Sequence, residues 1–500
     1  MTEDDLATRF ATTRALLEAI VADRSLLDHL SEDERTSFLT AAGDVYCPDV
    51  TERRLRTKAR NRQRRAERIA AVEQTRAETG IRTLRARRAA LTSPNVFAPP
   101  LPDPEPEPEI EPASRPATRV DAAQHCYVCK AKYHEIHHFY DQLCPTCAER
   151  NFAKRTETAD MTGRVALLTG GRVKIGFEAG LKLLRAGAHL IVTTRFPRDA
   201  ASRYAQAPDF ASWSHRLEIY GLDLRHTPSV EELCDHLLAR HERLDAIISN
   251  ACQTVRRPPA FYEHMMASET SSLTDLDPAA RAVLGGFEGL RAVEVLGDQQ
   301  VSSAHLSQLP LLAGDDQASP DHFPAGRLDE DGQQVDLRRR NSWRLMLDEV
   351  STVELLETQL VNAVAPFVLN ARLKALMVAS PGRDQHIVNV SAVEGQFYRR
   401  FKTTKHPHTN MAKAALNMMT RTSAAEYHAD GIHMNSVDTG WVTDEDPAHI
   451  ADAKTAEHRF HPPLDIVDGA ARIVDPIFSG LNTGEHMWGQ FLKDYRPTDW

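Results

Sequence analysis

The sequence has 500 residues, of which 42% are hydrophobic and 26% charged, as is ordinary for a globular protein, and its net charge is −10. This length exceeds what one hydrophobic core usually serves, so about two to four domains are expected. No apolar run approaching the ~18 residues of a membrane span stands out, and the acidic start "MTEDDLATRF" lacks a signal-peptide core. Four of the seven cysteines form two CxxC pairs, which favours a reducing compartment and a metal. We therefore expect a cytoplasmic protein without a membrane segment.

Residues 1–92 are predicted to be helical. Apolar and polar residues alternate at helical spacing in "TRALLEAIVADRSLLDHL", and Ser31 followed by Glu34 forms a capping-box pattern for a further short helix. From Arg53 to Arg88 the sequence holds 14 Lys/Arg against three Glu, with no proline and one glycine. This composition predicts one long basic helix.

The basic helix allows more than one interpretation. A binding arm would suit an acidic protein or a nucleic acid, but no aromatic residue interleaves the arginines to stack bases. We therefore expect either a protein partner, bound through residues 1–150, or a solvated helix that packs on a neighbour. In the second case the contacts would come from Leu55, Ile69, Val72, Ile81 and Leu84.

A linker rich in proline and glutamate marks a domain boundary at residues 93–118, "SPNVFAPPLPDPEPEPEIEPASRPAT". Proline fixes φ and removes backbone donors, so this segment should be an extended, semi-rigid spacer.

Residues 119–157 carry the pattern of a metal site. Two CxxC knuckles are separated by 14 residues, and together they can complete a closed tetrahedral site with no open position for water. We therefore expect a structural zinc ion. Three histidines between the knuckles are either alternative ligands or neighbours of the ligands: His134, His137 and His138. The expected ligands are Cys126, Cys129, Cys144 and Cys147.

From residue 158 onward, strands alternate with helices. The stretch "RVALLTGGRVKIG" (164–176) is an apolar strand that runs into a glycine-rich turn, and it is followed by a helix and a second strand, "HLIVTTRF". Glycine in such a turn lets backbone amides approach a pyrophosphate at the N-terminus of the helix. Further strands are predicted at "LEIYGLDL", "LDAIISNA", "HIVNVSA" and "IHMNSVDTG". This order predicts an α/β fold with a doubly wound parallel sheet, preceded by the helical region and the zinc module.

These motifs resemble the short-chain dehydrogenase/reductase family over about residues 160–500. The resemblance rests on "TGGRVKIG", "LDL", "SNA", "VNAVAPF", "VNVSAVEG", "MAKAAL" and "NSVDTGWVT". It implies a Rossmann fold, an NAD(P) cofactor, hydride transfer between a carbonyl and an alcohol, and a homo-oligomer. Lys174 departs from a glycine that is usual in the family. The implied cofactor-binding residues are Thr169, Gly170, Gly171, Arg172, Lys174, Ile175, Gly176, Thr194, Arg195, Asp223, Leu224, Asn250, Ala251, Lys413, Thr439, Gly440 and Val442.

The second strand indicates which nucleotide is bound. NAD-binding versions place a carboxylate about 20 residues after the glycine loop, to accept the ribose hydroxyls. Here that place reads Thr193-Thr194-Arg195, and a guanidinium can pair with a ribose 2′-phosphate. We expect NADP rather than NAD, although Arg195 could also be an ordinary residue at a strand end.

The family's two proton-handling hydroxyls are missing. The chemistry needs a tyrosine that protonates the carbonyl oxygen, a lysine, a serine and an asparagine. Lys413 and Asn362 match the lysine and the asparagine, but the serine position falls on Ala392 and the tyrosine position on Thr409. A threonine hydroxyl is a far weaker acid than a phenol.

Three replacements are conceivable. Tyr398 lies in the connecting loop, His408 or His406 titrates near neutral pH, and Ser391 adjoins the missing serine. For each residue the alternative is an ordinary packed or exposed side chain. The candidate catalytic residues are therefore Lys413, Asn362, Thr409, Tyr398 and Ser391.

An insertion of about residues 253–345 separates the two halves of the family pattern, and we expect it to lie over the nicotinamide end. Two functions remain closely matched. The first is an NADP-dependent oxidoreductase with an altered active site and an unknown small-molecule substrate. The second is a catalytically inactive NADP(H)-binding sensor or scaffold, whose zinc module and basic helix bind a partner. Nucleic-acid binding is the third and least favoured.

Overall fold

The structure is a computed structural model that describes residues 3–46, 50–89, 117–284, 302–312, 315, 321–329, 333–399 and 402–500. The chain forms two compact units, Met1–Gln74 and Thr75–Trp500. Most of the predicted linker and part of the predicted insertion lie outside the described residues.

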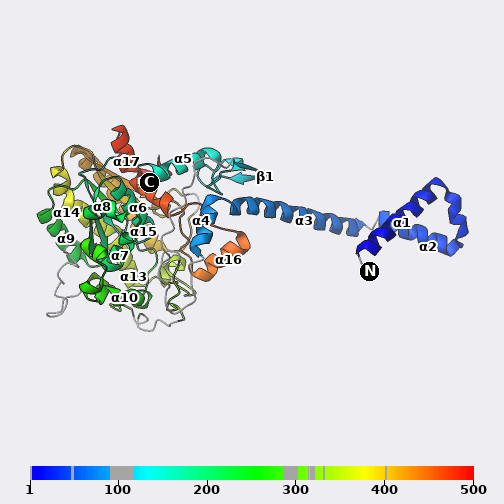
Figure 1. Cartoon of the computed structure of the whole chain (residues 1–500), viewed down its shortest axis with the longest axis horizontal. Coiled ribbons are helices and arrows are strands. Elements are labelled where there is room, and N and C mark those ends of the chain that lie inside the picture. Colours follow the sequence, from blue (N-terminus) through cyan, green and yellow to red (C-terminus); the bar gives the residue numbers. More distant parts are fainter. Residues whose placement is uncertain are drawn as a thin grey trace. The chain divides into compact units, whose positions relative to one another are not determined.

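The first unit consists of helices. They are α1 (Glu3–Ala22), a short 3₁₀ helix (Arg24–His29), α2 (Glu32–Tyr46) and most of α3 (Val50–Ala77) (Figure 1). The capping box that was predicted before α2 is confirmed. The Ser31 backbone N–H donates to Glu34 Oε2 at 3.1 Å, and the Glu34 N–H donates back to Ser31 Oγ at 3.4 Å.

The long basic helix expected from the sequence is present as α3, but it does not continue to Arg88. Helix α3 ends at Ala77, and a second helix, α4, runs over Gly80–Ala89 within the larger unit. The Gly80 N–H donates to the His138 carbonyl at 3.0 Å, and a Cβ on Gly80 would lie only 2.6 Å from Phe139 Cδ2. The glycine therefore lets α4 begin directly against residues 119–157, which contain the two CxxC pairs and are called the cysteine-rich module below. Of the five apolar residues proposed for packing, Ile81 on α4 is fully buried, whereas Leu55 and Ile69 on α3 are exposed.

The larger unit is built on an eight-stranded sheet with the order β10-β9-β8-β7-β6-β3-β4-β5. Its strands are parallel except for β10, which pairs antiparallel with β9. The predicted α/β class and the strands read from the sequence are confirmed. The bounds are β3 Val165–Thr169, β4 His189–Thr194, β5 Leu217–Gly221, β6 Ala246–Ser249, β7 Gln385–Ser391, β8 Ile432–Asp438, β9 Phe491–Lys493 and β10 Arg496–Thr498.

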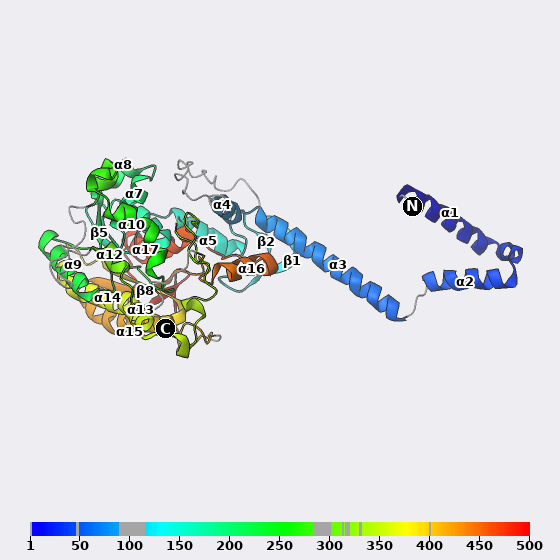
Figure 2. The ribbon, with the colours of Figure 1, turned by 90° about the horizontal axis from the view of Figure 1, so that it is seen from below.

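Helices cover both faces of this sheet (Figures 1 and 2). Successive residues of a strand face opposite layers, so Leu168 packs with α6 and α17, whereas Leu167 packs with α9, α14 and α15. The direction of chain progression reverses between β3 and β6, which places a crevice at the carboxyl ends of these two strands. The helix bounds are α6 Lys174–Arg185, α9 Thr227–Arg240, α14 Ala365–Ala379, α15 Pro407–Ala429 and α17 Ile466–Thr483.

One helical stretch is longer and more apolar than its sequence motif "VNAVAPF" indicates. Residues Thr352–Ala379 are long and apolar enough to cross a membrane by length and composition alone. In the structure this stretch comprises α13 (Thr352–Gln359), a π-helical turn (Leu360–Val364) and α14, and 44% of its most apolar window is buried. Leu369 and Leu373 of α14 pack in the core against the sheet, so packing explains part of the apolar character, whereas Phe367 and Val378 are exposed.

The cysteine-rich module belongs to the same compact unit as the sheet. It contains the antiparallel strands β1 (Thr118–His125) and β2 (Lys132–Ile136) and the helix α5 (Pro145–Thr156). Helix α5 lies beside α17 in Figure 1. The fully buried Arg472 of α17 donates to Asn151 Oδ1 of α5 at 2.6 Å and to Asp494 Oδ1 at 3.2 Å. A buried guanidinium with several acceptors fixes the orientation of the module closely.

Candidate nucleotide and metal sites

The glycine loop between β3 and α6 has the tight backbone that a pyrophosphate requires. Gly170 has φ +70°, and a Cβ on Gly176 would lie 2.1 Å from the Gly170 carbonyl oxygen. Both positions therefore require glycine. Lys174, where the family usually has glycine, also has a positive φ of +54°. The loop keeps its shape at a cost of about 1 kcal/mol for a side chain in the left-handed region.

The residues that directly follow strand β6 hold this loop through hydrogen bonds. Asn250 Nδ2 donates to the carbonyls of Thr169 and Gly170, both at 3.1 Å. The Ala251 N–H donates to Thr169 Oγ1 at 3.0 Å. Ile175 packs on α17, where a Cβ at Gly469 would lie 3.0 Å from its side chain. These residues shape the crevice and leave the amides of the loop to face a ligand.

Positive charge gathers where β4 ends. Arg195 Nη2 donates to the Tyr262 hydroxyl at 2.6 Å, and Arg172 pairs with Asp199 at 2.6 Å. Burial alone would raise the pKa of Tyr262, but the charges of Arg195, Arg257 and Arg172 hold it below its usual value. Phe196 follows Arg195, and its N–H donates to Thr194 Oγ1 at 3.2 Å. Cations thus surround a buried oxygen at the place expected for the 2′-phosphate.

Asp223 follows β5, the strand next to β4, and is already paired. Its carboxylate accepts from Arg225 Nη2 at 2.7 Å, and Arg225 Nη1 also donates to Glu357 at 2.9 Å. Burial would raise the pKa of Asp223, but the Arg225 charge and hydrogen bonds hold it below its usual value. The adjoining Leu224 is buried in the core. Asp223 therefore faces the crevice as part of an ion pair rather than as a free acceptor.

The expected active-site lysine and asparagine are both buried. Lys413 Nζ donates to the Val390 carbonyl at 2.9 Å, which joins α15 to the end of β7. Asn362 lies in the π-helical turn, where its side chain accepts from the Gln253 N–H at 2.8 Å and donates to the Gln253 carbonyl at 3.0 Å. Such π-helical turns recur at functional sites.

Two buried hydroxyls close to this lysine have no hydrogen-bond partner among the residues that the structure describes. Thr409 Oγ1 lies one helical turn before Lys413 on the same face of α15, and Ser391 Oγ ends β7. Their residues are only 1% and 3% exposed. A buried hydroxyl without a partner costs free energy unless a ligand satisfies it, so the pair fits a polar ligand such as the ribose or the reacting oxygen.

The alternative proton donors do not join this group. Tyr398 is 90% exposed. His406 stacks on Trp343 with ring centres 3.9 Å apart, and burial lowers its pKa to about 4. His408 points towards Glu354 of α13, at 3.8 Å, and burial lowers its pKa too. Both imidazoles are therefore neutral at pH 7 and hold no readily released proton.

A loop after β8 supplies the residues expected on the nicotinamide side. Gly440 has φ +77°, and its N–H donates to Asp438 Oδ1 at 2.7 Å. Thr439 is half-buried and Val442 is buried. No sequence pattern indicates that Asp438 holds this loop, because the partner of a strand-end carboxylate depends on tertiary geometry.

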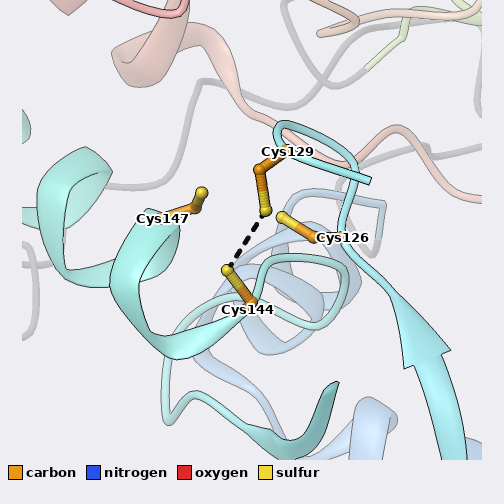
Figure 3. Close-up of side chains that lie close together, drawn as sticks. All are labelled: Cys126, Cys129, Cys144 and Cys147. Carbon is orange, nitrogen blue, oxygen red and sulfur yellow. Dashed lines mark hydrogen bonds between the residues drawn. The ribbon is translucent and has the colours of Figure 1, made fainter. Parts of the chain in front are cut away.

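The four predicted cysteine ligands come together at one point (Figure 3). Their Sγ atoms all lie within 4.8 Å of one another, and Cys129 Sγ is 3.6 Å from Cys144 Sγ. A tetrahedral zinc–thiolate site has sulfurs about 3.8 Å apart, so the geometry suits such an ion. The Ala131 N–H lowers the pKa of Cys129 to about 7. Among the described residues no histidine joins this group, and His134 Nδ1 instead faces the Val120 carbonyl at 3.0 Å.

The described part of the insertion covers more than the expected nicotinamide end. An apolar cluster of its residues packs on Phe196 after β4, near the end of the crevice opposite to Lys413. Farther along, Asn341 Nδ2 donates to the Glu445 carbonyl at 2.8 Å, beside the loop that follows β8. The insertion therefore spans the length of the crevice. The cluster members are Phe261, Tyr262, Met265, Ala304 and Phe323.

A buried carboxylate joins the insertion to the helix that follows β4. Glu269, in the helix Glu263–Thr270, accepts from the Arg198 and Asp199 N–H groups at the start of helix Pro197–Ala205. Burial raises the pKa of Glu269 to about 7, against the lowering effect of the two N–H groups. Because the pKa of Glu269 is higher in the folded than in the unfolded state, folding favours the protonated carboxyl. The contribution of Glu269 to the free energy of unfolding is therefore full below the unfolded-state pKa and is lost as pH rises through about 7.

We expect the Glu269→Gln variant to lose less thermal stability than the unsubstituted protein between pH 6 and pH 8, because the amide cannot ionise. Scanning calorimetry at both pH values measures the difference. Glu263→Gln, an exposed residue of the same helix, is the control and should leave the pH dependence unchanged. Equal pH dependence in all three proteins would contradict the prediction.

The fold and the crevice define a Rossmann-type α/β unit, and comparisons with known proteins identify its family. Residues 164–275 match the family model described as short chain dehydrogenase, and residues 344–464 match one described as Enoyl-(Acyl carrier protein) reductase. The chain belongs to the short-chain dehydrogenase/reductase family. The gap between the two matches, residues 276–343, falls in the insertion.

Individual relatives are distant. An uncharacterized protein, R665, of Acanthamoeba polyphaga mimivirus is 30% identical over 379 residues, which cover 74% of each chain. Human retinol dehydrogenase 13 is 30% identical over 95 residues, 19% of this chain and 28% of that protein. Among solved structures, the Pseudomonas aeruginosa RhlG/NADP active-site complex is 17% identical with a TM-score of 0.42, covering 67% of this chain and 95% of that one.

Proposed function

We propose that the protein binds NADP(H) in the crevice between β3 and β6 and catalyses hydride transfer between a carbonyl and an alcohol. The observation that carries the proposal is the group around Lys413. A buried lysine and the buried Asn362 occupy the family's positions, and two buried hydroxyls beside them have no partner within the described part of the chain. If this group of residues had only a structural role, we would expect both hydroxyls to form hydrogen bonds with other protein atoms.

The residues of the chain would divide the work as follows. The amides of the glycine loop bind the pyrophosphate, and Lys413 holds the nicotinamide ribose. When bound, NADPH supplies the hydride. The hydroxyls of Thr409 and Ser391 donate hydrogen bonds to the substrate oxygen, where negative charge develops.

The proton that completes the reduction needs a separate source. A threonine hydroxyl is too weak an acid to give it up unaided, but it can relay one from a neighbouring acid. Lys413 lies one turn away on the same helical face and carries ionisable protons, so we assign it as the donor through Thr409. Each proton then has to pass through a threonine hydroxyl, which is itself a far weaker acid than a phenol, so turnover should be slow.

The preference for NADP over NAD is supported by the arginines at the end of β4. We propose that the 2′-phosphate replaces the Tyr262 hydroxyl as the partner of Arg195. A charged hydrogen bond is stronger than one to a phenol, so this exchange favours the phosphorylated nucleotide. It requires the insertion to shift at Tyr262.

The Arg195→Ala variant tests this assignment. Its Kd for NADPH should rise about ten- to hundredfold, as expected when a charge-assisted contact is lost, while its Kd for NADH stays unchanged. Arg185→Ala, which removes an exposed arginine paired with Asp209, is the control. Titration of nucleotide fluorescence gives both constants. Equal weakening for NADPH and NADH would contradict the assignment to the 2′-phosphate.

A second candidate is a nucleotide-binding protein without catalysis, which senses NADP(H) or serves as a scaffold. It is favoured by one observation: the structure brings none of Tyr398, His406 and His408 to Thr409. Under this proposal residues 1–150 bind a protein partner.

A single set of measurements separates the two candidates. Native mass spectrometry of the purified protein identifies the bound nucleotide and counts metal ions. NADPH oxidation is then followed with a panel of aldehydes and ketones. Turnover that depends on Lys413 supports the oxidoreductase. Binding without turnover across the panel supports the second candidate, and absence of nucleotide binding excludes both.

A further inference from the structure

The segment 439–464, which follows β8, is held by residues from outside the Rossmann fold. The Trp441 N–H donates to the Tyr127 hydroxyl at 2.9 Å. Gln142 Nε2 donates to the His461 carbonyl at 2.9 Å, and Arg85 donates to the carbonyl of Leu464 at 2.6 Å. Tyr127 and Gln142 belong to the cysteine-rich module, and Arg85 lies on α4, which begins against that module.

Tyr127 lies within the first metal knuckle. It directly follows Cys126 and precedes Cys129 by two residues, so ligation of these two cysteines fixes its backbone. Its own N–H donates to the Gln142 carbonyl at 2.8 Å, which ties it to the second knuckle. A side chain in this position can move little while all four thiolates hold one ion.

The contact made by Tyr127 continues into the candidate active site. Gly440, next to Trp441, donates to Asp438 Oδ1 at 2.7 Å, and Asp438 Oδ2 accepts from the Val393 N–H at 2.7 Å. Val393 follows the strand that ends with Ser391. Lys493 lies between the two ends of this chain of contacts, with its Nζ 3.7 Å from Asp438 and 5.7 Å from the Tyr127 ring centre.

We propose that the metal-bound cysteine module positions the segment 439–464 through the Tyr127 hydroxyl, and thereby sets the approach of Thr439, Gly440 and Val442 to the bound nicotinamide. The part concerning nicotinamide rests on the proposed function; the positioning of the segment does not. Tyr127 is a positioning residue, because it touches the loop backbone and not the reacting atoms. The module thus helps to shape the candidate site by positioning this segment.

The same segment has a second anchor that provides an internal comparison. On the side of the insertion, Asn341 donates to the Glu445 carbonyl, and Arg344 pairs with Asp446 at 2.5 Å. If the module positions only its own side, disturbance of Tyr127 should loosen residues 440–442, disturbance of the whole module should also loosen residues 461–464, and both should leave residues 444–447 in place.

Hydrogen–deuterium exchange of the full-length protein tests the proposal without reference to activity. In Tyr127→Phe, amide exchange at residues 440–442 should become about two- to tenfold faster, as expected for the loss of one neutral hydrogen bond. Removal of the metal with a chelator should give at least this increase, at residues 461–464 as well. Tyr133→Phe is the matched control. It removes a hydroxyl that donates to Asp141 inside the module, and it should leave the segment unchanged.

Unchanged exchange at residues 440–442 in both Tyr127→Phe and the metal-free protein would overturn the proposal. Equal loosening in Tyr133→Phe would overturn it as well, since the effect would then be general destabilisation of the module. NADPH binding is measured on the same samples. If Tyr127→Phe accelerates exchange but no variant binds NADPH, the proposed function fails while the positioning role stands.

Discussion

Replacing Cys144 by alanine is expected to destabilise the larger unit by more than about 4 kcal/mol, the range associated with loss of a structural metal. The four sulfurs already converge to within 4.8 Å, so three remaining thiolates would hold an ion with one open position and lower affinity. Scanning calorimetry gives the loss of thermal stability, and native mass spectrometry gives the number of metal ions per chain.

The control for this prediction is Cys234→Ala. Cys234 is fully buried in α9 but lies outside the cluster, so its replacement removes a small apolar group without touching a metal ligand. A loss of about 1 kcal/mol is expected there. A Cys144→Ala protein with one metal ion per chain and an unchanged melting temperature would show that Cys144 is not a ligand.

Loss of the metal should extend beyond the module, because buried charges join it to the Rossmann fold. Arg155 of α5 pairs with Asp465 at 2.7 Å and with Asp468 at 3.2 Å. Burial opposes the charge of Arg155, yet these carboxylates raise its pKa. If α5 separates from α17, these buried carboxylates lose their partner, which is costly. We therefore expect the module and α17 to unfold together.

Much of this fold could be predicted because it depends on local patterns. Short apolar runs separated by helices identify parallel strands, and Gly170 and Gly176 are required by the backbone itself. The spacing of Cys126, Cys129, Cys144 and Cys147 predicts their convergence in the same way, since each knuckle is a local structure.

The remaining features depend on contacts between distant residues, which spacing does not encode. The break between α3 and α4 follows from the approach of Gly80 to Phe139, some 60 residues away. Likewise, no local pattern indicates that Tyr262, in the insertion, contacts the Arg195 side chain. From the sequence, Tyr127 is distinguished only by its position directly after the expected ligand Cys126. Its hydroxyl accepts a hydrogen bond from the N–H of Trp441, which lies more than 300 residues later in the sequence.

Removing the Lys413 ammonium should have the largest effect on activity. We expect Lys413→Met to lower kcat by about 10²- to 10⁴-fold, the usual contribution of a positioned acid or base. Methionine fills a similar volume, so the cost to stability should be limited to the lost hydrogen bond with the Val390 carbonyl, about 1 kcal/mol. Steady-state NADPH oxidation gives kcat, and calorimetry checks the fold.

Binding measurements make this experiment decisive between the two candidate functions. Lys374→Met is the control, because Lys374 pairs with Glu426 and Asp430 on the surface, and its loss should leave kcat and the Kd for NADPH unchanged. If the protein is an oxidoreductase, Lys413→Met lowers turnover well beyond its effect on the Kd. If it only senses the nucleotide, there is no turnover to lose, and the Kd alone rises because the ribose loses a donor. A Lys413→Met protein with unchanged turnover and unchanged Kd would remove the lysine from both proposals, since neither the relay through Thr409 nor the ribose contact could then exist.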